Sequence, residues 1–170
     1  MGGRKDWRGE RLTPAAAKAV GDFLGSHTTM TLATSGEDGP WAAALFYARD
    51  SDLNLYFVSA SNTRHAVDIE RNPKVAVAVN AQHKDWSDIR GLQIGGVAEI
   101  VPSDQRAGAV ETYLAKFPAL RPLFSAPRNE QESRIAQAFA ASPFYRVRPN
   151  RIRFIDNSKA FGHSDEYVLD

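Results

Sequence analysis

The 170-residue chain contains no cysteine, which excludes disulfide bonds, thiolate zinc sites and cysteine nucleophiles. No apolar stretch is long enough to span a bilayer, and residues 1–11 lack the apolar segment of a signal peptide. An excess of charge of either sign is also missing, because 21 basic residues stand against 20 acidic ones. We therefore expect a cytoplasmic protein that neither enters a membrane nor attracts nucleic acid through its overall charge.

Familiar catalytic motifs are absent as well. The chain has no GxSxG elbow, no Walker phosphate loop and no GxGxxG fingerprint. Its four histidines, His27, His65, His83 and His163, have neither zinc-ligand spacing nor a carboxylate-rich cluster beside them. We expect no metal site, and since no acid–base pair stands out, the catalytic residues stay unknown.

What the chain does contain is a series of short alternating or β-branched segments separated by turn residues. Its length and its 43% hydrophobic content suit one domain, residues 1–170, with residues 1–12 as a flexible N-terminus. The short connections favour an antiparallel barrel over a parallel sheet. The predicted fold class is mainly β (α+β), an antiparallel six- to seven-stranded barrel with short flanking helices. Strands are predicted at Thr28–Ser35, Pro40–Arg49, Leu53–Ser59, Lys74–Asn80, Ile89–Val101, Phe144–Arg148 and Arg151–Ile155.

Helices are predicted at the junctions between these strands. The first begins at Thr13-Pro14, where a hydroxyl N-cap precedes a proline at the first helical position, and it ends near Gly25. A proline-punctuated loop is expected over Pro118–Pro127. Further helices are predicted at Arg64–Glu70, Ser103–Phe117 and Glu130–Ala141.

Two features of the long strands follow from local chemistry. The pair Gly95-Gly96 predicts a β-bulge or a barrel corner. A hairpin at Pro149-Asn150 would set Arg148 opposite Arg151, and like charges across a strand pair are unfavourable. We therefore predict one bent strand there, and its basic cluster is expected to be a solvated face and not a nucleic-acid stripe.

The segment Ser59–Pro73, "SASNTRHAVDIERNP", joins a strand to a short helix through hydroxyl and amide side chains. A helix N-terminus offers unpaired backbone N–H groups and a partial positive charge, which together bind phosphate. Asn62 or Thr63 can cap the helix or reach an anion, while Arg64 and His65 can donate to phosphate oxygens. Plain helix caps are common, so the cap chemistry by itself favours the simpler interpretation.

Four aromatic residues lie in or beside predicted loops: Trp41, Trp86, Phe161 and Tyr167. They can pack in the core, form a dimer seam or make the wall of a binding site for a flat ligand. The sequence leaves these alternatives open.

Three successive segments of the sequence favour an anion-binding turn over a plain helix cap at Ser59–Pro73. "MTLATSGEDGPWAAALFYA", "LYFVSASNTRHAVDIERNPKVAVAV" and "IRGLQIGGVAEIV" resemble the opening hairpin, the signature turn and the next long strand of one superfamily. It is the FMN-binding split-barrel superfamily of pyridoxamine 5'-phosphate oxidase. The resemblance runs from Thr28 to Val101, and "FYRVRPNRIRFIDNSKAFGH" looks like the closing strand of a small bacterial branch. The order and spacing of the segments carry the resemblance, since no single motif is decisive.

The resemblance implies a split β-barrel homodimer with FMN at the subunit interface. It implies that the turn at Thr63 holds the FMN phosphate, that the preceding strand end follows the ribityl chain, and that the second strand faces the isoalloxazine ring. It also implies that the long strand reaches the flavin from across the interface and that the C-terminal segment closes over the ring. The implied cofactor-binding residues are Ala43, Ala44, Leu45, Phe46, Val58, Ser59, Asn62, Thr63, Arg64, His65, Arg90, Gly91, Gln93 and Phe161.

The chain departs from the vitamin B6 oxidase in two places. Its second strand, "WAAALFYA", has alanines where the oxidase carries basic residues, and its C-terminus, "FGHSDEYVLD", lacks the arginine-and-histidine ending. The resemblance therefore favours an FMN-dependent oxidoreductase with a more apolar pocket and an unidentified small-molecule substrate. The alternatives are a non-enzymatic flavin-binding or flavin-sensing protein, or the same barrel with a deazaflavin or a haem. For haem, His65 and His163 are the candidate axial ligands.

Overall fold

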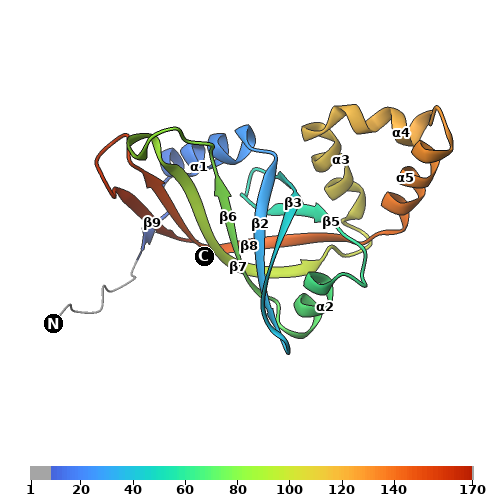
Figure 1. Cartoon of the computed structure of the whole chain (residues 1–170), viewed down its shortest axis with the longest axis horizontal. Coiled ribbons are helices and arrows are strands. Elements are labelled where there is room, and N and C mark those ends of the chain that lie inside the picture. Colours follow the sequence, from blue (N-terminus) through green and yellow to red (C-terminus); the bar gives the residue numbers. More distant parts are fainter. Residues whose placement is uncertain (1–8, 170) are drawn as a thin grey trace.

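A long strand, β8 (Phe144–Asp156), organises the sheet in the computed structural model, which describes residues 9–169. One edge of β8 pairs along its length with the antiparallel strand β7 (Arg90–Ile100). The other edge is shared, because its first part pairs with β5 (Leu55–Val58) and its last part with β9 (Ser164–Val168). The prediction of one bent strand across Pro149-Asn150, in place of a hairpin, is confirmed (Figure 1).

The remaining pairings close the strands into a ring. β7 pairs with β6 (Lys74–Asn80), β6 with β2 (Thr29–Gly36), and β2 with β3 (Gly39–Phe46). After the single residue Tyr47 the chain enters β4 (Ala48–Arg49), which pairs with β5 and so returns to β8. These ladders are all antiparallel. The predicted fold class, a mainly β (α+β) protein with an antiparallel barrel, is therefore confirmed.

Within residues 9–169 the sheet has nine strands, more than the predicted six to seven. The additions are short or polar: β4, β9, and β1 (Glu10–Arg11), which runs parallel to β9. Of the N-terminal segment predicted to be flexible, residues 1–8 lie outside the described part of the chain. In the rest of that segment, Glu10 and Arg11 form β1 and pair with Tyr167 and Val168, and its flexibility stays a prediction.

Helices occupy the junctions, as predicted, and Thr13 Oγ1 accepts the expected capping hydrogen bond from the Ala16 amide. The prediction of a loop over Pro118–Pro127 is wrong. Two short helical segments lie there, each with a proline in its first two positions, where a missing N–H costs nothing.

None of the helices within residues 9–169 combines the length and the apolar character needed to cross a membrane. The helical segments are α1 (Pro14–Ser26), α2 (Arg64–Arg71), η1 (Trp86–Asp88), α3 (Arg106–Lys116), η2 (Pro118–Leu120), α4 (Arg121–Ser125) and α5 (Glu130–Ala141).

The barrel interior is filled by one side of each strand. In β6, Val75, Val77 and Val79 are buried while Ala76 is exposed. The alternating residues of the sequence therefore point by turns into the barrel and away from it. A register shift at Gly95-Gly96 confirms the predicted bulge. The largest fully buried side chains of the interior include Leu32, Leu55, Phe57, Leu92, Ile94 and Ile152.

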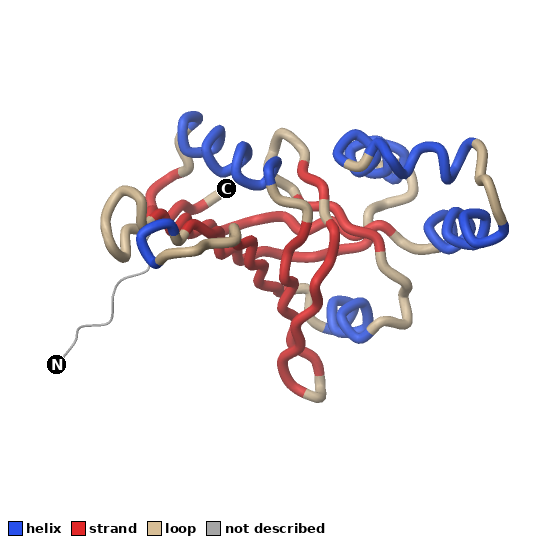
Figure 2. Tube along the Cα trace, turned by 45° about the horizontal axis from the view of Figure 1, so that its top comes forward, coloured by secondary structure: helices blue, strands red, loops and turns tan. Residues whose placement is uncertain are grey.

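A second core lies outside the barrel, where α3 packs on β4, β5 and β8. Ala109 and Tyr113 of α3 contact a buried group formed by Ala48, Tyr56 and Phe144. Figures 1 and 2 show α3, α4 and α5 gathered at this end of the sheet, α1 near the other end, and α2 by itself beside the β2–β3 hairpin. The fold therefore places α2 against β2 and β3 at the hairpin end of these strands.

Candidate functional site

The short helix α2 is fastened to the β2–β3 hairpin. Thr34 of β2 donates a 2.7 Å hydrogen bond to the Asp68 carboxylate of α2, and both side chains are buried. At the surface, Arg71 forms a 2.7 Å ion pair with Glu37 in the hairpin turn. These contacts fix where the N-terminus of α2 lies relative to the barrel.

Ser59, Thr63 and His65 form a hydrogen-bonded group at this N-terminus, which we call the hydroxyl–histidine cluster. The Nε2 atom of His65 lies 2.7 Å from Ser59 Oγ and 3.1 Å from Thr63 Oγ1. Thr63 is the N-cap residue, but its side chain makes no capping hydrogen bond and donates instead to the Ala60 carbonyl. Asn62, the other predicted cap, is exposed one residue earlier. The first-turn amides of α2 therefore receive no help from the N-cap side chain.

Burial lowers the pKa of His65 below its usual value of 6.5, and the nearby Asp68 carboxylate opposes this shift in part. The imidazole is consequently neutral at pH 7, with one nitrogen as donor and the other as acceptor. Since its Nε2 atom faces two hydroxyl groups, each able to donate or accept, the cluster can turn donors toward an incoming anion.

Arg64 bridges the start of α2 and the start of β3. Its Nη2 atom lies 3.1 Å from the Asp38 carbonyl and 3.4 Å from the Gly39 carbonyl, while the guanidinium lies 4.8 Å above the Trp41 ring. The sequence left open whether Trp41 packs in the core, at a dimer seam or against a ligand. In the structure its half-exposed ring supports the Arg64 guanidinium. Arg64 stands between Thr63 and His65 in the sequence, so its contacts with β3 hold a positive charge beside the hydroxyl–histidine cluster.

Two of the four β3 residues that the resemblance assigns to the flavin ring, Ala44 and Phe46, lie on the outside of the barrel, whereas Leu45 packs against its core. Ala44 and Phe46 are exposed, whereas Ala43 and Leu45 are half-buried. Strand pairing continues the exposed positions across the sheet in two rows. The first contains Ala44, Thr31, Ala78, Gln93 and Arg153, and the second contains Ala42, Ala33, Ala76, Gly95 and Arg151.

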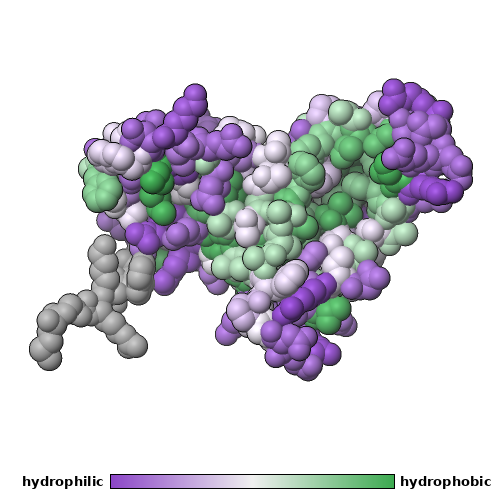
Figure 3. Space-filling view, in the orientation of Figure 1, coloured by the Kyte–Doolittle hydropathy of each residue, from purple (hydrophilic) through white to green (hydrophobic). Residues whose placement is uncertain are grey.

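We call the six small residues of β2, β3 and β6 in these rows the outer alanine face. All six are exposed or half-buried: Thr31, Ala33, Ala42, Ala44, Ala76 and Ala78. Beside them the surface is hollowed by a cavity of about 400 Å³ that reaches Gln93, Arg153 and Glu166. In Figure 3 weakly polar and apolar colours cover the central strands and continue toward α3–α5. None of the side chains on this face is larger than threonine, so little projects from the strands.

The other residues assigned by the resemblance lie elsewhere in the same chain. Val58, at the end of β5, packs against the second core beside α3. Gly91 is buried in β7. The Nε atom of Arg90 lies 3.3 Å from Asp156 Oδ2, at the opposite end of β8 from α2. Phe161 is 80% exposed and meets the Trp86 ring edge-on, with 5.5 Å between centroids.

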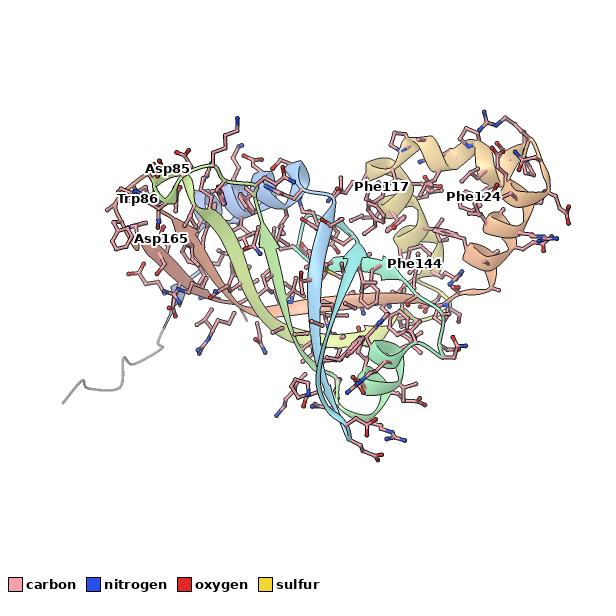
Figure 4. The ribbon with its side chains drawn as sticks, in the orientation of Figure 1. Asp85, Trp86, Phe117, Phe124, Phe144 and Asp165 are labelled. Atoms are coloured by element: carbon pink, nitrogen blue, oxygen red, sulfur yellow. The ribbon has the colours of Figure 1, made fainter. Side chains whose placement is uncertain are left out.

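Figure 4 makes the separation visible, because Trp86 and Asp165 lie at one end of the molecule and Phe117, Phe124 and Phe144 at the other. Within one chain the structure therefore brings the hydroxyl–histidine cluster and Arg64 together and leaves Arg90 and Phe161 apart from them. Only a second chain could carry Arg90 or Phe161 to the cluster, and that role stays a prediction.

The basic cluster on β8 is partly neutralised by glutamates. Arg146 Nε and Arg148 Nη2 lie 3.0 Å and 2.9 Å from the Glu99 carboxylate of β7, and Arg153 lies 3.6 Å from Glu166 of β9. Cross-strand pairing thus sets opposite charges beside each other, which sequence spacing alone did not show. Within residues 9–169, no three His, Asp or Glu side chains gather as a set able to hold a metal ion.

Sequence reasoning missed Thr34 and Asp68, the pair that anchors α2. A signal was present: Asp68 stands beside Ile69, on the side of the helix that the apolar residues mark as buried. A carboxylate on a buried side needs a hydrogen-bond partner, although the sequence does not say which residue supplies it.

Comparison with known proteins agrees with this architecture. The family model described as pyridoxamine 5'-phosphate oxidase matches residues 16–156. The chain belongs to this family. A UPF0306 protein of Klebsiella pneumoniae is 32% identical over 145 residues, which cover 85% of this chain and 87% of that protein. The UPF0306 protein YhbP of Salmonella schwarzengrund is 29% identical over 153 residues, 89% of this chain and 92% of that protein. These relatives are UPF0306 proteins and not the vitamin B6 oxidase itself.

Solved structures support the same fold. The protein Rv2991 from Mycobacterium tuberculosis superimposes with a TM-score of 0.67 and 25% identity, covering 91% of this chain and 92% of that one. A haem-binding protein from Mycobacterium smegmatis gives a TM-score of 0.69 at 20% identity, covering 92% of this chain and 59% of that one. The predicted family and fold class are confirmed.

Proposed function

We propose that this protein binds FMN, with the phosphate at the hydroxyl–histidine cluster, and acts as an oxidoreductase on a small molecule. The cluster carries the proposal, because it stands at a helix N-terminus whose first-turn amides are not capped by the Thr63 side chain. Such a helix end favours an anion through its N–H groups and its dipole.

The donor set fits a phosphate group. Ser59 and Thr63 offer hydroxyls, neutral His65 offers one ring N–H, and Arg64 offers a planar guanidinium that matches phosphate oxygens. The outer alanine face suits the rest of the cofactor, because small side chains let a planar ring approach the strands. When bound, FMN supplies the electron chemistry, and the protein positions it.

We also propose that a second copy of the chain covers the outer alanine face, so that FMN lies between two subunits. The support is the breadth of this exposed, uncharged surface, which extends over three neighbouring strands. The positions of Arg90 and Phe161 agree with a composite site, because neither reaches the cluster of its own chain.

Haem is the second candidate, since a haem-binding protein shares the fold. The possible axial ligands already have partners: His65 Nε2 faces Ser59 and Thr63, and His163 Nε2 lies 3.2 Å from Asp165. The chemistry of the cluster, which is rich in donors for an anion, therefore favours FMN over haem.

Titration of the purified chain with FMN tests the cofactor assignment. We expect quenching of FMN fluorescence at one FMN per chain, tighter binding than for riboflavin, and reduction of the bound flavin by NADPH with turnover of an acceptor. Bound flavin without any turnover would support the flavin-binding or sensing alternative. A Soret band formed with haemin, or binding of a deazaflavin without FMN, would overturn the assignment.

Light scattering tests the dimer. We expect a mass of two chains for the native protein and of one chain for Ala76→Arg, which puts a charge on the outer alanine face. Ala115→Arg, at an exposed position of α3, is the matched control and should stay dimeric. A native protein with the mass of one chain would contradict the proposed subunit arrangement.

A further inference from the structure

A second apolar cavity lies at the opposite end of β3 from the Arg64–Trp41 contact. Its volume is about 330 Å³, which is at the small end of the range for ligand sites. Phe46 of β3, Tyr113 and Phe117 of α3, and Leu120 of η2 contribute to its walls. Phe46 is 58% exposed and meets the Phe117 ring edge-on, with centroids 5.7 Å apart. An aromatic side chain is thus held at the mouth of the cavity without being buried.

One cation lines this cavity. The Nζ atom of Lys116, the last residue of α3, lies 3.0 Å from the Leu24 carbonyl at the end of α1 and 3.8 Å from the centre of the Tyr47 ring. Within residues 9–169, no carboxylate forms an ion pair with Lys116. Burial and the nearby positive charge of Arg49 lower the pKa of Lys116 to about 8, so it is mostly cationic at pH 7.

A purely structural role explains part of this arrangement. The Lys116 ammonium and the Tyr47 hydroxyl both donate to the Leu24 carbonyl, and Arg49 donates to the Gly21 carbonyl, so three side chains satisfy the C-terminal turn of α1. That role does not require an open aromatic cavity beside the ammonium, and it does not explain the exposure of Phe46.

We propose that this cavity binds a small aromatic carboxylate, with its ring against Phe46 and Phe117 and its carboxylate on Lys116. The aromatic walls match a flat apolar body, and the ammonium without a carboxylate partner matches one negative charge. The site shares Phe46 with the residues that the resemblance assigns to the flavin, but its other walls come from α3 and η2, so benzoate binding can be tested in the chain without FMN.

Binding of benzoate, with benzyl alcohol as its uncharged analogue, tests the charge recognition in the full chain without FMN. Isothermal calorimetry should detect benzoate binding to the native protein. Lys116→Met, which keeps the length of the stem, should weaken benzoate about tenfold or more, the scale of a charge-assisted hydrogen bond. It should leave benzyl alcohol nearly unchanged, and Lys116→Arg should restore much of the benzoate affinity.

Two controls separate recognition from folding. Lys18→Met removes an exposed lysine that pairs with Asp22 and should leave benzoate binding as it is. Phe46→Ala should weaken benzoate and benzyl alcohol alike, because it removes a wall that both ligands touch. Equal losses of both ligands in Lys116→Met, or a native protein that ignores millimolar benzoate, would overturn the proposal.

The native protein supplies a readout that needs no variant. Benzoate affinity should fall as the pH rises from 7 through about 8 to 9, because Lys116 loses its charge in that interval. The titratable or charged groups beside Lys116 or in the cavity wall include Tyr47, Arg49 and Tyr113, with His27 at the end of α1. Burial raises the pKa of Tyr47 and moves that of Tyr113 to about 12, so neither loses a proton in this interval. A flat pH profile would contradict recognition by Lys116.

Discussion

Thr34 and Asp68 join two segments that are 34 residues apart in the sequence through one buried 2.7 Å hydrogen bond. The bond ties the middle of α2 to the barrel strand β2. Because α2 has only eight residues and carries part of the hydroxyl–histidine cluster at its start, its placement decides where the cluster lies. The stability of this contact is therefore linked to the geometry of the site.

Thr34→Val removes the hydroxyl donor and leaves the Asp68 carboxylate buried without it. We expect the free energy of unfolding to fall by roughly 1.5–3 kcal/mol, the range for hydrogen bonds to charged groups. Urea denaturation measures the change. Thr28→Val, at an exposed position outside the outer alanine face, is the matched control and should stay within about 0.5 kcal/mol of the native protein. Equal losses of unfolding free energy in the two variants would show that the Thr34–Asp68 hydrogen bond does not stabilise the fold more than a surface hydroxyl does.

Gly36→Ala should disturb the same contact from the other side. A Cβ atom at Gly36 would overlap the Asp68 carboxylate, which must then move away from Thr34. We expect a loss of roughly 1–3 kcal/mol in unfolding free energy, as for other overpacked sites. At Gly108 of α3 an added Cβ meets nothing within 4 Å, so Gly108→Ala should stabilise the helix by roughly 0.5–1 kcal/mol. Destabilisation by both changes would point to a general intolerance of alanine.

Arg64→Ala tests the phosphate assignment directly. If Arg64 contacts the phosphate, the variant should lose roughly 1.5–3 kcal/mol of FMN binding free energy and almost none for riboflavin, which lacks that group. Fluorescence titration of both ligands gives the comparison. Arg71→Ala, at the other end of α2 and paired with Glu37 at the surface, is the control and should bind FMN normally. Equal weakening of both ligands by Arg64→Ala would refute the contact.

The lowered pKa of His65 predicts a pH dependence of stability. The unfolded chain has its histidine pKa near 6.5, above that of the folded state, so the unfolded state binds more protons in the interval between them. The contribution of His65 is complete above about 6.5 and is lost as the pH falls toward the folded pKa. Urea denaturation at pH 7.5 and 5.5 should show a smaller acid loss for His65→Gln, and identical losses would contradict the assignment.

Local patterns were enough to predict several elements. Strand β6 and helix α5 have the predicted bounds, Lys74–Asn80 and Glu130–Ala141, because alternation and helical spacing are local properties. The bulge at Gly95-Gly96 and the start of α2 at Arg64 also follow from the neighbouring residues. The pattern of Pro118–Pro127 does not predict η2 and α4, because prolines usually mark loops, whereas here they stand in the first helical positions.

Strand β9 was missed for a different reason. "SDEYV" carries polar residues at three successive positions, and only pairing with the end of β8 makes it a strand. The same holds for β1, which needs β9 as its partner. Two-residue and polar strands depend on a neighbouring edge, so their own sequence predicts them poorly.

The sequence by itself determined the kinds of chemistry that are excluded, the alternation that makes a barrel, and the grouping of Ser59, Thr63 and His65 within seven residues. Tertiary structure alone decided that Arg64 lies on Trp41, that Asp68 meets Thr34, and that Lys116 reaches the end of α1. The physical reason is range. Backbone dihedrals and the sides of strands and helices are set by nearby residues, whereas contacts between residues 23 to 92 positions apart depend on the register of the whole sheet.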